Sequence, residues 1–273
     1  MKISVVTPSY NQLAYLKLCV ASIADQRGID VEHIIQDAGS SGNLEDFKSK
    51  PGVRLFVESD EGMYDAINRG LRRATGEVCA YLNCDEQYLP GSLKKVADFF
   101  KANPSIEVVF GDVILVDNAG QPLAYRRTIL PTGSHLRLVH LNTPTCATFF
   151  RRDLLDRGFY FDPAWKVIGD AVWMASLLNN QVGMGTIREP LSAFTFTGQN
   201  LGATTHSESE SIRWRSDSLH RRGRRTIAIL WHRLKKAVAG SYFRRTVNIQ
   251  IYTLDSPDQR QRYRKRIGFG WPA

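Results

Sequence analysis

Apolar residues in the first hundred positions follow two alternating spacings. Four short runs rich in β-branched and aromatic residues are typical of buried strands, at residues 3–7, 31–36, 54–58 and 77–82. Between them, apolar side chains recur every three or four residues, as on one face of a helix, at 16–23 and 64–71. This strand–helix order predicts an α/β fold with a mostly parallel sheet and helices on both of its faces.

Three of the predicted strands end in polar, loop-forming residues, at 7–11, 37–42 and 83–86. The carboxyl ends of parallel strands meet at one edge of a sheet, and ligands of such sheets bind in the crevice beyond that edge. We therefore expect Tyr10, Asp37, Asp85 and Glu86 to lie on one rim of the molecule.

The pattern changes after about residue 100. Residues 108–116 and 122–127 flank a turn-forming Asn118-Ala119-Gly120 segment, which predicts a hairpin, and 169–178 has helical spacing. From residue 207 onward the pattern is helical and basic. We therefore divide the chain into a domain at 1–206 and a basic helical C-terminal extension at 207–273.

Charge is distributed unevenly along the chain. Residues 211–273 hold 16 Lys and Arg against 3 Asp and Glu, whereas the rest holds 20 against 24. In this tail Ile227, Leu230, Leu234 and Val238 form an apolar stripe flanked by basic residues, which is typical of an amphipathic helix at an anionic surface.

Composition excludes several classes of protein. With 43% hydrophobic and 23% charged residues the chain is not disordered as a whole. It has no run of about 18 apolar residues, so we expect no membrane-spanning helix. The four cysteines form no C-x-x-C pair, which argues against a disulfide framework or a zinc knuckle and favours free thiols in the cytosol.

Three segments carry candidate chemistry. The adjacent carboxylates of Asp85 and Glu86 follow a strand and offer the hard oxygen ligands that divalent cations prefer. Residues 59–70 place many polar groups at a helix start, and Tyr10 offers a flat face for stacking on a base or sugar. Each segment taken alone is also typical of ordinary structure: a solvated turn, an exposed charged helix face, and a strand–helix turn capped by Asn11.

Taken together and in this order, the segments resemble the inverting glycosyltransferases of family two, which have the GT-A fold, a Rossmann-like nucleotide-binding architecture. The matching stretches are "VVTPSYNQ", "IIQDAGSSGN", "ESDEGMYDAINRGLRRATGEVCAYLNCDEQYLPGSL" and "FDPAWKVIGDAVWMASLL". The resemblance covers about residues 1 to 200 and leaves the basic tail uncovered. It implies that 1–100 is the nucleotide-sugar-binding half of the domain and 101–206 the acceptor half.

The resemblance also implies roles for single residues. Ten of them match positions that hold the sugar-nucleotide donor: Thr7, Pro8, Ser9, Tyr10, Asp37, Asp60, Tyr64, Asn68, Asn83 and Cys84. Asp85 matches the last carboxylate of the family's Asp-x-Asp element, which binds Mn²⁺ or Mg²⁺ on the donor diphosphate. Glu86 and His206 are further candidate metal ligands, although an exposed loop histidine is an alternative for His206.

Asp170 matches the catalytic base of the family, with a helix N-cap as the alternative. Trp173, one turn later, is a candidate for stacking on an acceptor sugar, with a buried core position as the alternative. The chain departs from the family at Asn83 and Glu86, and at Thr145-Cys146, where many relatives carry His-Gln.

The resemblance thus implies an inverting, metal-dependent glycosyltransferase that moves a sugar from a nucleotide diphosphate to an acceptor hydroxyl in polysaccharide or glycolipid biosynthesis. We expect a saccharide or lipid-linked saccharide as acceptor. The protein would be cytoplasmic, with the 211–273 tail on the anionic inner face of the cytoplasmic membrane.

Three alternatives remain open from the sequence. A sugar-nucleotide nucleotidyltransferase would need a phosphate loop rich in Gly, Lys and Arg after the first strand, and residues 7–13 contain none of these. The basic tail has interleaved aromatic residues, as nucleic-acid-binding modules do, but the acidic rim of the body opposes nucleic acid, which we do not expect as a partner. An inactive GT-A-like protein is the third, because of the departures at residues 83, 86 and 145–146.

Overall fold

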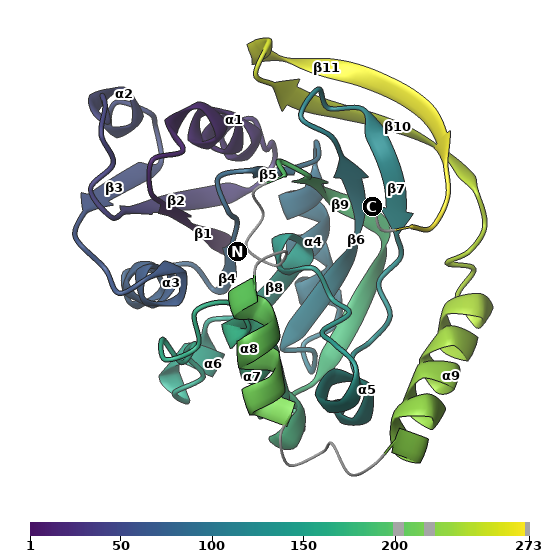
Figure 1. Cartoon of the computed structure of the whole chain (residues 1–273). Coiled ribbons are helices and arrows are strands. Elements are labelled where there is room, and N and C mark those ends of the chain that lie inside the picture. The colour runs from purple at the N-terminus through teal and green to yellow at the C-terminus, as the bar shows by residue number, and fades with distance from the viewer. Residues whose placement is uncertain (199–204, 216–221, 271–273) are drawn as a thin grey trace.

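One curved sheet of nine strands lies at the centre of the computed structural model, which describes residues 1–198, 205–215 and 222–270 (Figure 1). Its strands are β1 (Lys2–Ser9), β2 (Asp30–Asp37), β3 (Val53–Val57), β4 (Val78–Tyr81), β5 (Glu86–Tyr88), β6 (Val108–Val116), β7 (Pro122–Arg126), β8 (Thr148–Arg151) and β9 (Met184–Thr195). They are ordered β3-β2-β1-β4-β8-β6-β9-β5, and β7 pairs with β6.

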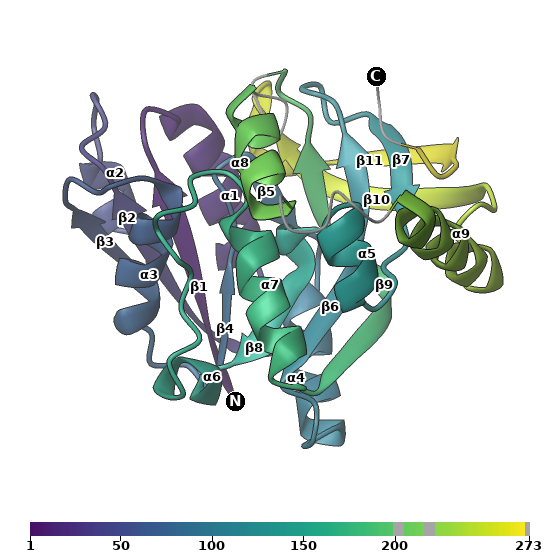
Figure 2. The same ribbon diagram turned by 60° about the horizontal axis from the view of Figure 1, so that its bottom comes forward.

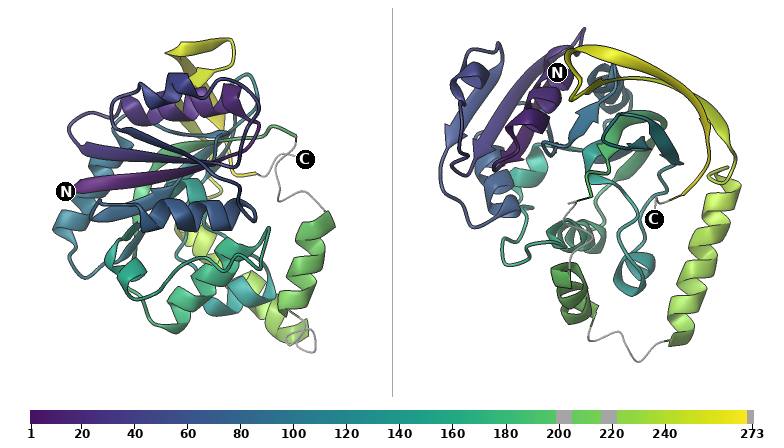
Figure 3. Two further views of the ribbon diagram at one scale, coloured as in Figure 1. Left: turned by 90° about the vertical axis from the view of Figure 1, so that its left-hand side faces the viewer. Right: turned by 45° about the horizontal axis from the view of Figure 1, so that its top comes forward.

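Nine helices accompany the sheet in the described part of the chain. They are α1 (Leu13–Ala24), α2 (Glu45–Lys48), α3 (Met63–Arg72), α4 (Ser92–Ala102), α5 (Gly133–Leu138), α6 (Asp153–Asp156), α7 (Gly169–Asn179), α8 (Thr205–Arg215) and α9 (Arg222–Val238). The left panel of Figure 3 shows α1 and α3 on opposite faces of the strands. The α/β fold with helices on both faces is therefore confirmed.

The first half of the sheet is parallel and the second half is mixed. Strands β3, β2, β1 and β4 pair in parallel, as their sequence spacing predicts. Beyond β4 the sheet continues through antiparallel β8, and β6 pairs in parallel with β9. The predicted hairpin is present as β6 and β7, closed by the Asp117 side chain, which accepts hydrogen bonds from the amides of Ala119 and Gln121.

Two apolar layers hold the helices to the sheet. One packs α1 and α4 against one face of β1 and β4, through residues such as Cys19, Phe100 and Val5. The other packs α3 and α7 against the opposite face. The close approach of α3 to β1 requires Gly70, because a Cβ there would lie 2.4 Å from a Val6 methyl group.

The C-terminal extension is only partly helical, so the prediction of a helical extension is wrong for its last part. After α9 the chain forms an antiparallel hairpin of β10 (Arg245–Thr253) and β11 (Ser256–Ile267). Every second residue of β10 from Val247 to Thr253 is buried, and this period of two belongs to a strand. The division of the chain at residue 206 stays a prediction.

The hairpin packs across the body of the molecule beside α1 and β7 (Figure 3, right). Val247, Ile249 and Ile251 bury their side chains against a cluster that includes Ile114 and Tyr125. The extension is thus joined to the central sheet by an apolar layer of its own.

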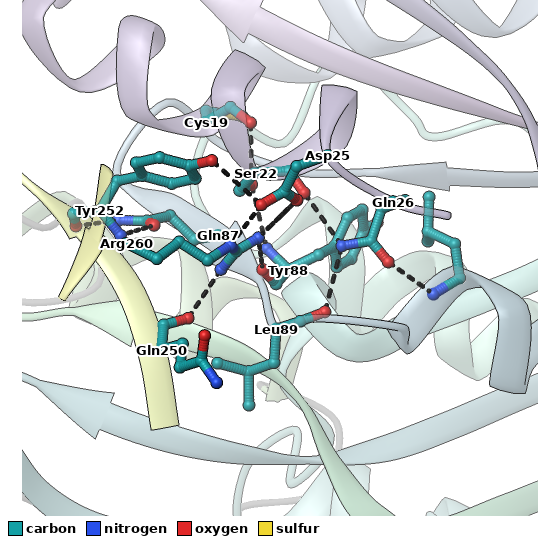
Figure 4. Close-up of polar contacts among 11 residues, drawn as sticks. Cys19, Ser22, Asp25, Gln26, Gln87, Tyr88, Leu89, Gln250, Tyr252 and Arg260 are labelled. Carbon is teal, nitrogen blue, oxygen red and sulfur yellow. Dashed lines mark hydrogen bonds and ion pairs between the residues drawn. The ribbon is translucent and has the colours of Figure 1, made fainter. Parts of the chain in front are cut away.

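An ion pair and several hydrogen bonds of Arg260 fix the hairpin to α1 and β5 (Figure 4). The Arg260 guanidinium, 8% exposed, pairs with the Asp25 carboxylate through contacts of 2.5 and 2.8 Å. It also donates to the backbone carbonyls of Gln250 and Tyr88, at 2.7 and 3.0 Å. The Tyr252 hydroxyl donates to the same carboxylate. One guanidinium therefore ties three elements together.

Helix α9 packs against α5 at the edge of the molecule (Figure 2). Five large apolar side chains on it are more than half exposed: Ile227, Leu230, Trp231, Leu234 and Val238. The predicted amphipathic stripe is therefore present and faces outward. Within the described residues, no helix combines the length and the apolarity needed to cross a bilayer.

From the contacts of Arg260 we predict a loss of stability when this residue is replaced. Replacing it in Arg260→Met removes the cationic partner of Asp25, which keeps the Tyr252 hydroxyl as a donor, and removes one donor each from the carbonyls of Ser22, Gln250 and Tyr88. We expect a loss of about 2 kcal/mol in the free energy of unfolding, below the roughly 3–5 kcal/mol typical of fully buried pairs, because Asp25 is 29% exposed. Arg264 is exposed on the same strand, and Arg264→Met should cost under about 0.5 kcal/mol. Equal losses in urea titrations would contradict the assignment.

Candidate active site

A cleft of about 1240 Å³ opens beyond the carboxyl ends of β1 and β4 and reaches toward α7 and α9. Ten of the residues singled out from the sequence line it: Pro8, Ser9, Tyr10, Asp60, Tyr64, Asn83, Cys84, Asp85, Glu86 and Asp170. They come from four separate stretches of sequence, at 8–10, 60–64, 83–86 and 170. The structure thus gathers them in one place, at the sheet edge where ligands of parallel sheets bind.

Four other predicted residues lie behind the cleft wall. Thr7 is fully buried and bonds to the His33 ring at 2.9 Å, and the Asp37 carboxylate accepts hydrogen bonds from Gly39 and Ser40. Asn68 bonds to both backbone groups of Phe161 at 2.7 and 3.0 Å. These side chains hold the turns that shape the cleft.

Trp173 is the fourth residue behind the wall. It is 4% exposed, stacks on Phe161 at a centroid distance of 4.9 Å, and donates its indole N–H to the Phe159 carbonyl. It occupies the core position that was the alternative to acceptor stacking. The side chain of His206, in α8, lies outside the described residues.

The candidate metal loop joins β4 to β5 at the floor of the cleft. Glu86 is fully buried, and one of its oxygens accepts the Asn83 amide at 2.9 Å. Its other oxygen, and the side-chain oxygen of Asn83, are buried without a hydrogen-bond partner. Burial raises the pKa of both Asp85 and Glu86, and the charge of Asp85 raises the pKa of Glu86 further.

These residues fit a divalent cation that is held partly by its substrate. Buried, partnerless oxygens on Asn83 and Glu86 stand beside the Asp85 carboxylate, and all are hard ligands. Over the described ranges, three or more His, Cys, Asp or Glu side chains nowhere converge as a complete metal cage. Mg²⁺ and Mn²⁺ commonly bind through one or two carboxylates together with substrate phosphates. Cys146, one of the family departures, is buried beside Glu86.

Asp170 lies in the first turn of α7 and lines the same cleft. Burial raises the pKa of Asp170 to about 6, and its hydrogen bonds with the Ala171 amide and the Tyr64 side chain act in the opposite direction. The N-cap position of α7 is Ile168, and no side chain caps the helix. Asp170 is therefore not the N-cap that its sequence context also allowed.

Tyr64 and α7 approach each other closely at this point. Gly169 makes the approach possible, because a Cβ there would lie 2.7 Å from the Tyr64 ring. The Tyr64 hydroxyl donates to the Val167 carbonyl at 3.1 Å, and its ring stacks on Phe161. The aromatic contact fixes the start of α7, and with it Asp170, against α3.

Comparison with known proteins decides the family. The model of "Glycosyl transferase family 2" matches residues 4–159, more than half of the chain. The chain belongs to glycosyl transferase family 2. This confirms the resemblance drawn from the sequence motifs, and with it the expectation of a glycosyltransferase. Asp170 and the whole C-terminal extension lie beyond the matched residues.

Three curated relatives show how far this family 2 chain resembles named proteins. An uncharacterized glycosyltransferase of Nostoc sp. is 27% identical over 77% of this chain and 71% of its own length. A PGL/p-HBAD biosynthesis glycosyltransferase of Mycobacterium bovis is 36% identical over 41% of this chain and 46% of its own. A GalNAc(5)-diNAcBac-PP-undecaprenol beta-1,3-glucosyltransferase of Campylobacter jejuni is 29% identical over 42% and 38%. The match thus spans less than half of the latter two proteins.

Solved structures of S. aureus TarS share the fold of this family 2 chain. One TarS structure aligns with a TM-score of 0.58 and 17% identity over 92% of this chain and 58% of TarS. TarS 1–349 in complex with UDP-GlcNAc aligns with a TM-score of 0.58 and 14% identity over 92% and 96%. The likeness confirms the predicted GT-A fold.

Glu210, on α8, holds the segment that leads into Asp170. Its carboxylate accepts hydrogen bonds from three consecutive backbone amides, those of Lys166, Val167 and Ile168, at 2.7 to 3.1 Å. These bonds lower the pKa of Glu210 against the effect of burial. We did not predict this role, because Glu210 lies in an alternating Ser–Glu run that looks like an exposed helix.

Four further residues that line the cleft were also not predicted. They are Arg126 at the end of β7, Lys236 on α9, Phe269 after β11 and His140. All four come from segments without a motif. They meet only because β7, α9 and the end of the hairpin pack together in this family 2 chain.

Glu210 predicts a local change in hydrogen exchange. In Glu210→Ala the amides of residues 166–168 lose a charged acceptor, and such bonds contribute about 1.5–3 kcal/mol. We expect their exchange to accelerate at least about tenfold by mass spectrometry or NMR. Ile212→Ala, an exposed change on the same helix, should leave these amides unchanged. Unchanged exchange in Glu210→Ala would show that α8 does not hold this segment.

Proposed function

We propose that the chain is an inverting, metal-dependent glycosyltransferase that moves a sugar from a nucleotide diphosphate to an acceptor hydroxyl. The observation that carries this proposal is that Asp85 and Asp170 line one cleft, each in surroundings that suit its part in the reaction. Family 2 membership supports it over a nucleotidyltransferase or a nucleic-acid-binding protein. An inactive family member is distinguished by the transfer test below.

The donor would bind across the rim and floor of the cleft. Tyr10 is 62% exposed at the rim, so its ring is available for stacking on a base. Asp85, with the buried oxygens of Asn83 and Glu86, would hold a Mg²⁺ or Mn²⁺ ion. When bound, that ion supplies Lewis-acid stabilisation of the charge that develops on the departing diphosphate.

Asp170 would act as the base for the acceptor hydroxyl. With a pKa of about 6 it is mostly ionised at neutral pH, yet basic enough to accept a proton as the hydroxyl attacks the anomeric carbon. The proton moves to the Asp170 carboxylate while the sugar–phosphate bond breaks on the opposite face of the ring. A single displacement of this kind inverts the anomeric centre.

Relatives support the classes of donor and acceptor. TarS was solved with UDP and with UDP-GlcNAc, which favours a nucleotide-sugar donor here. The name of the Campylobacter jejuni relative includes a saccharide linked to PP-undecaprenol, and the Mycobacterium bovis relative is named for PGL/p-HBAD biosynthesis. We therefore propose a saccharide or lipid-linked saccharide as acceptor, in polysaccharide or glycolipid biosynthesis.

Two conservative substitutions separate donor binding from transfer. Asp85→Asn should weaken Mn²⁺-dependent binding of a panel of nucleoside diphosphates at least about tenfold in calorimetry. Asp170→Asn should leave that binding intact and lower the transfer rate about 100-fold or more. Asp156→Asn, an exposed change, is the matched control. Metal-dependent binding that survives in Asp85→Asn would refute the metal assignment.

The pH profile is a second readout of Asp170 when metal-dependent donor binding is followed over the same range, because burial raises the pKa of Asp85 to about 6 as well. A base works only when deprotonated, so transfer should fall as the pH drops through about 6 and should level off above it. Binding without any transfer by the unmodified chain, across acceptors, would instead indicate the inactive alternative.

We also propose that α9 rests on an anionic bilayer, on the predicted inner face of the cytoplasmic membrane. Its outward apolar stripe is flanked by exposed cations, Arg224, Arg225 and Arg233 among them. An amphipathic helix with this composition inserts its apolar face at the headgroup boundary, and each nearby cation adds about 1 kcal/mol on anionic lipid.

Vesicle flotation tests this contact. On phosphatidylglycerol-rich vesicles, the double change Leu230→Glu and Leu234→Glu should reduce binding at least about tenfold, because burial of each side chain contributes about 1.5–3 kcal/mol. Leu254→Glu, an exposed leucine at the hairpin turn, is the matched control. Equal flotation of the double variant and the control would exclude α9 as the docking element.

A further inference from the structure

Lys236 is a buried cation that lines the cleft. It is 8% exposed and lines the cleft beside Arg126 and Phe269. Its ammonium lies 4.6 Å from the centroid of the Phe269 ring, and the Arg126 guanidinium lies 4.7 Å from the same centroid. Within the ranges that the structure describes, Lys236 forms neither an ion pair nor a side-chain hydrogen bond. Two positive charges thus share one aromatic ring.

The phase of α9 explains why Lys236 points inward. Ala228, His232 and Lys236 are spaced four residues apart and are each under a tenth exposed, so they share the face that packs on the body. Leu230 and Leu234 lie on the outward face. The same helix therefore carries an apolar face on one side and delivers an ammonium group into the cleft on the other.

Burying the Lys236 ammonium in this position lowers the free energy of unfolding. Burial, together with the charges of Arg126 and Arg233, lowers the pKa of Lys236 to about 8. Proteins rarely bury an ammonium without a carboxylate partner, since an apolar side chain of similar size serves packing better. The acids that line the cleft, Asp60, Asp85, Glu86 and Asp170, come from other elements of the fold.

We propose that Lys236 and Arg126 form an anion subsite that takes a phosphate or diphosphate group of the acceptor. This inference rests on the proposed function, which assigns the donor diphosphate to the cation held near Asp85. An anion held by Lys236 and Arg126 then belongs to the other substrate. A phosphate on a lipid carrier would reach the cleft from the bilayer side of α9, and a soluble phosphorylated saccharide would enter from solution.

Calorimetry with EDTA present tests the subsite apart from the metal site. The probes are inorganic pyrophosphate, geranyl diphosphate and the uncharged alcohol geraniol. We expect both diphosphates to bind the unmodified chain. Lys236→Met should weaken their binding at least tenfold, and Lys236→Arg should retain most of the affinity. Arg233→Met, which removes an exposed cation from the same helix, should change affinity less than twofold. Tighter binding of geranyl diphosphate than of pyrophosphate assigns a lipid-linked source, and equal binding assigns a soluble one.

Identical diphosphate affinities for the unmodified chain and Lys236→Met would overturn the proposal. Because no metal and no transfer is involved, that failure leaves the metal-dependent binding test at Asp85 unaffected, and the two proposals can fail separately.

Thermal unfolding separates a binding role from a packing role. If Lys236 serves a ligand, Lys236→Met should have a Tm equal to or above that of the unmodified chain, and pyrophosphate should raise the Tm of the unmodified chain alone. A Tm several degrees lower in Lys236→Met, with no pyrophosphate shift in either protein, would identify Lys236 as a structural residue and would overturn the proposal.

Discussion

The structure depends on keeping two adjacent carboxyl groups, Asp85 and Glu86, in a tight loop at the floor of a cleft. Burial and mutual repulsion oppose their charge, so the loop must be held from outside. Strand β5, which begins at Glu86, is held by β9 and by the C-terminal hairpin: Gln87 exchanges two hydrogen bonds with the Tyr252 backbone, and Arg260 donates to the Tyr88 carbonyl. The extension is thus part of the support of the candidate metal loop.

Local patterns were sufficient to predict the first half of the fold and many of the residues that line the cleft. Four strands with a period of two, separated by helical stripes, specify a parallel sheet, and polar residues after such strands must meet at one edge. Tyr10 and Asp85 could be placed together on this basis alone. The same argument placed Asp37 on the rim, but its carboxylate is used by the turn amides of Gly39 and Ser40. Edge position does not specify which way a side chain points.

The parts that could not be predicted depend on contacts between distant segments. Glu210 gains its role from three amides more than forty residues away, and Lys236 gains its place from the packing of α9 on the body. The hairpin β10–β11 was missed for another reason. Its strand period was visible in Val247, Ile249 and Ile251, but the high density of arginine and lysine around it favoured a continuous basic helix.

The uneven distribution of charge along the sequence also bears on the cleft, which both the acidic body and the basic extension line. Acids from the body and cations from β7 and α9 line the same cleft, and they come from separate elements of the fold. Under the two proposals above, the donor would bind with its cation at Asp85 and an anionic acceptor would bind at Lys236 and Arg126, so charge would favour one placement of each substrate. In that case the basic extension would serve the proposed chemistry of the site through Lys236 as well as the proposed contact with the bilayer through the outward face of α9.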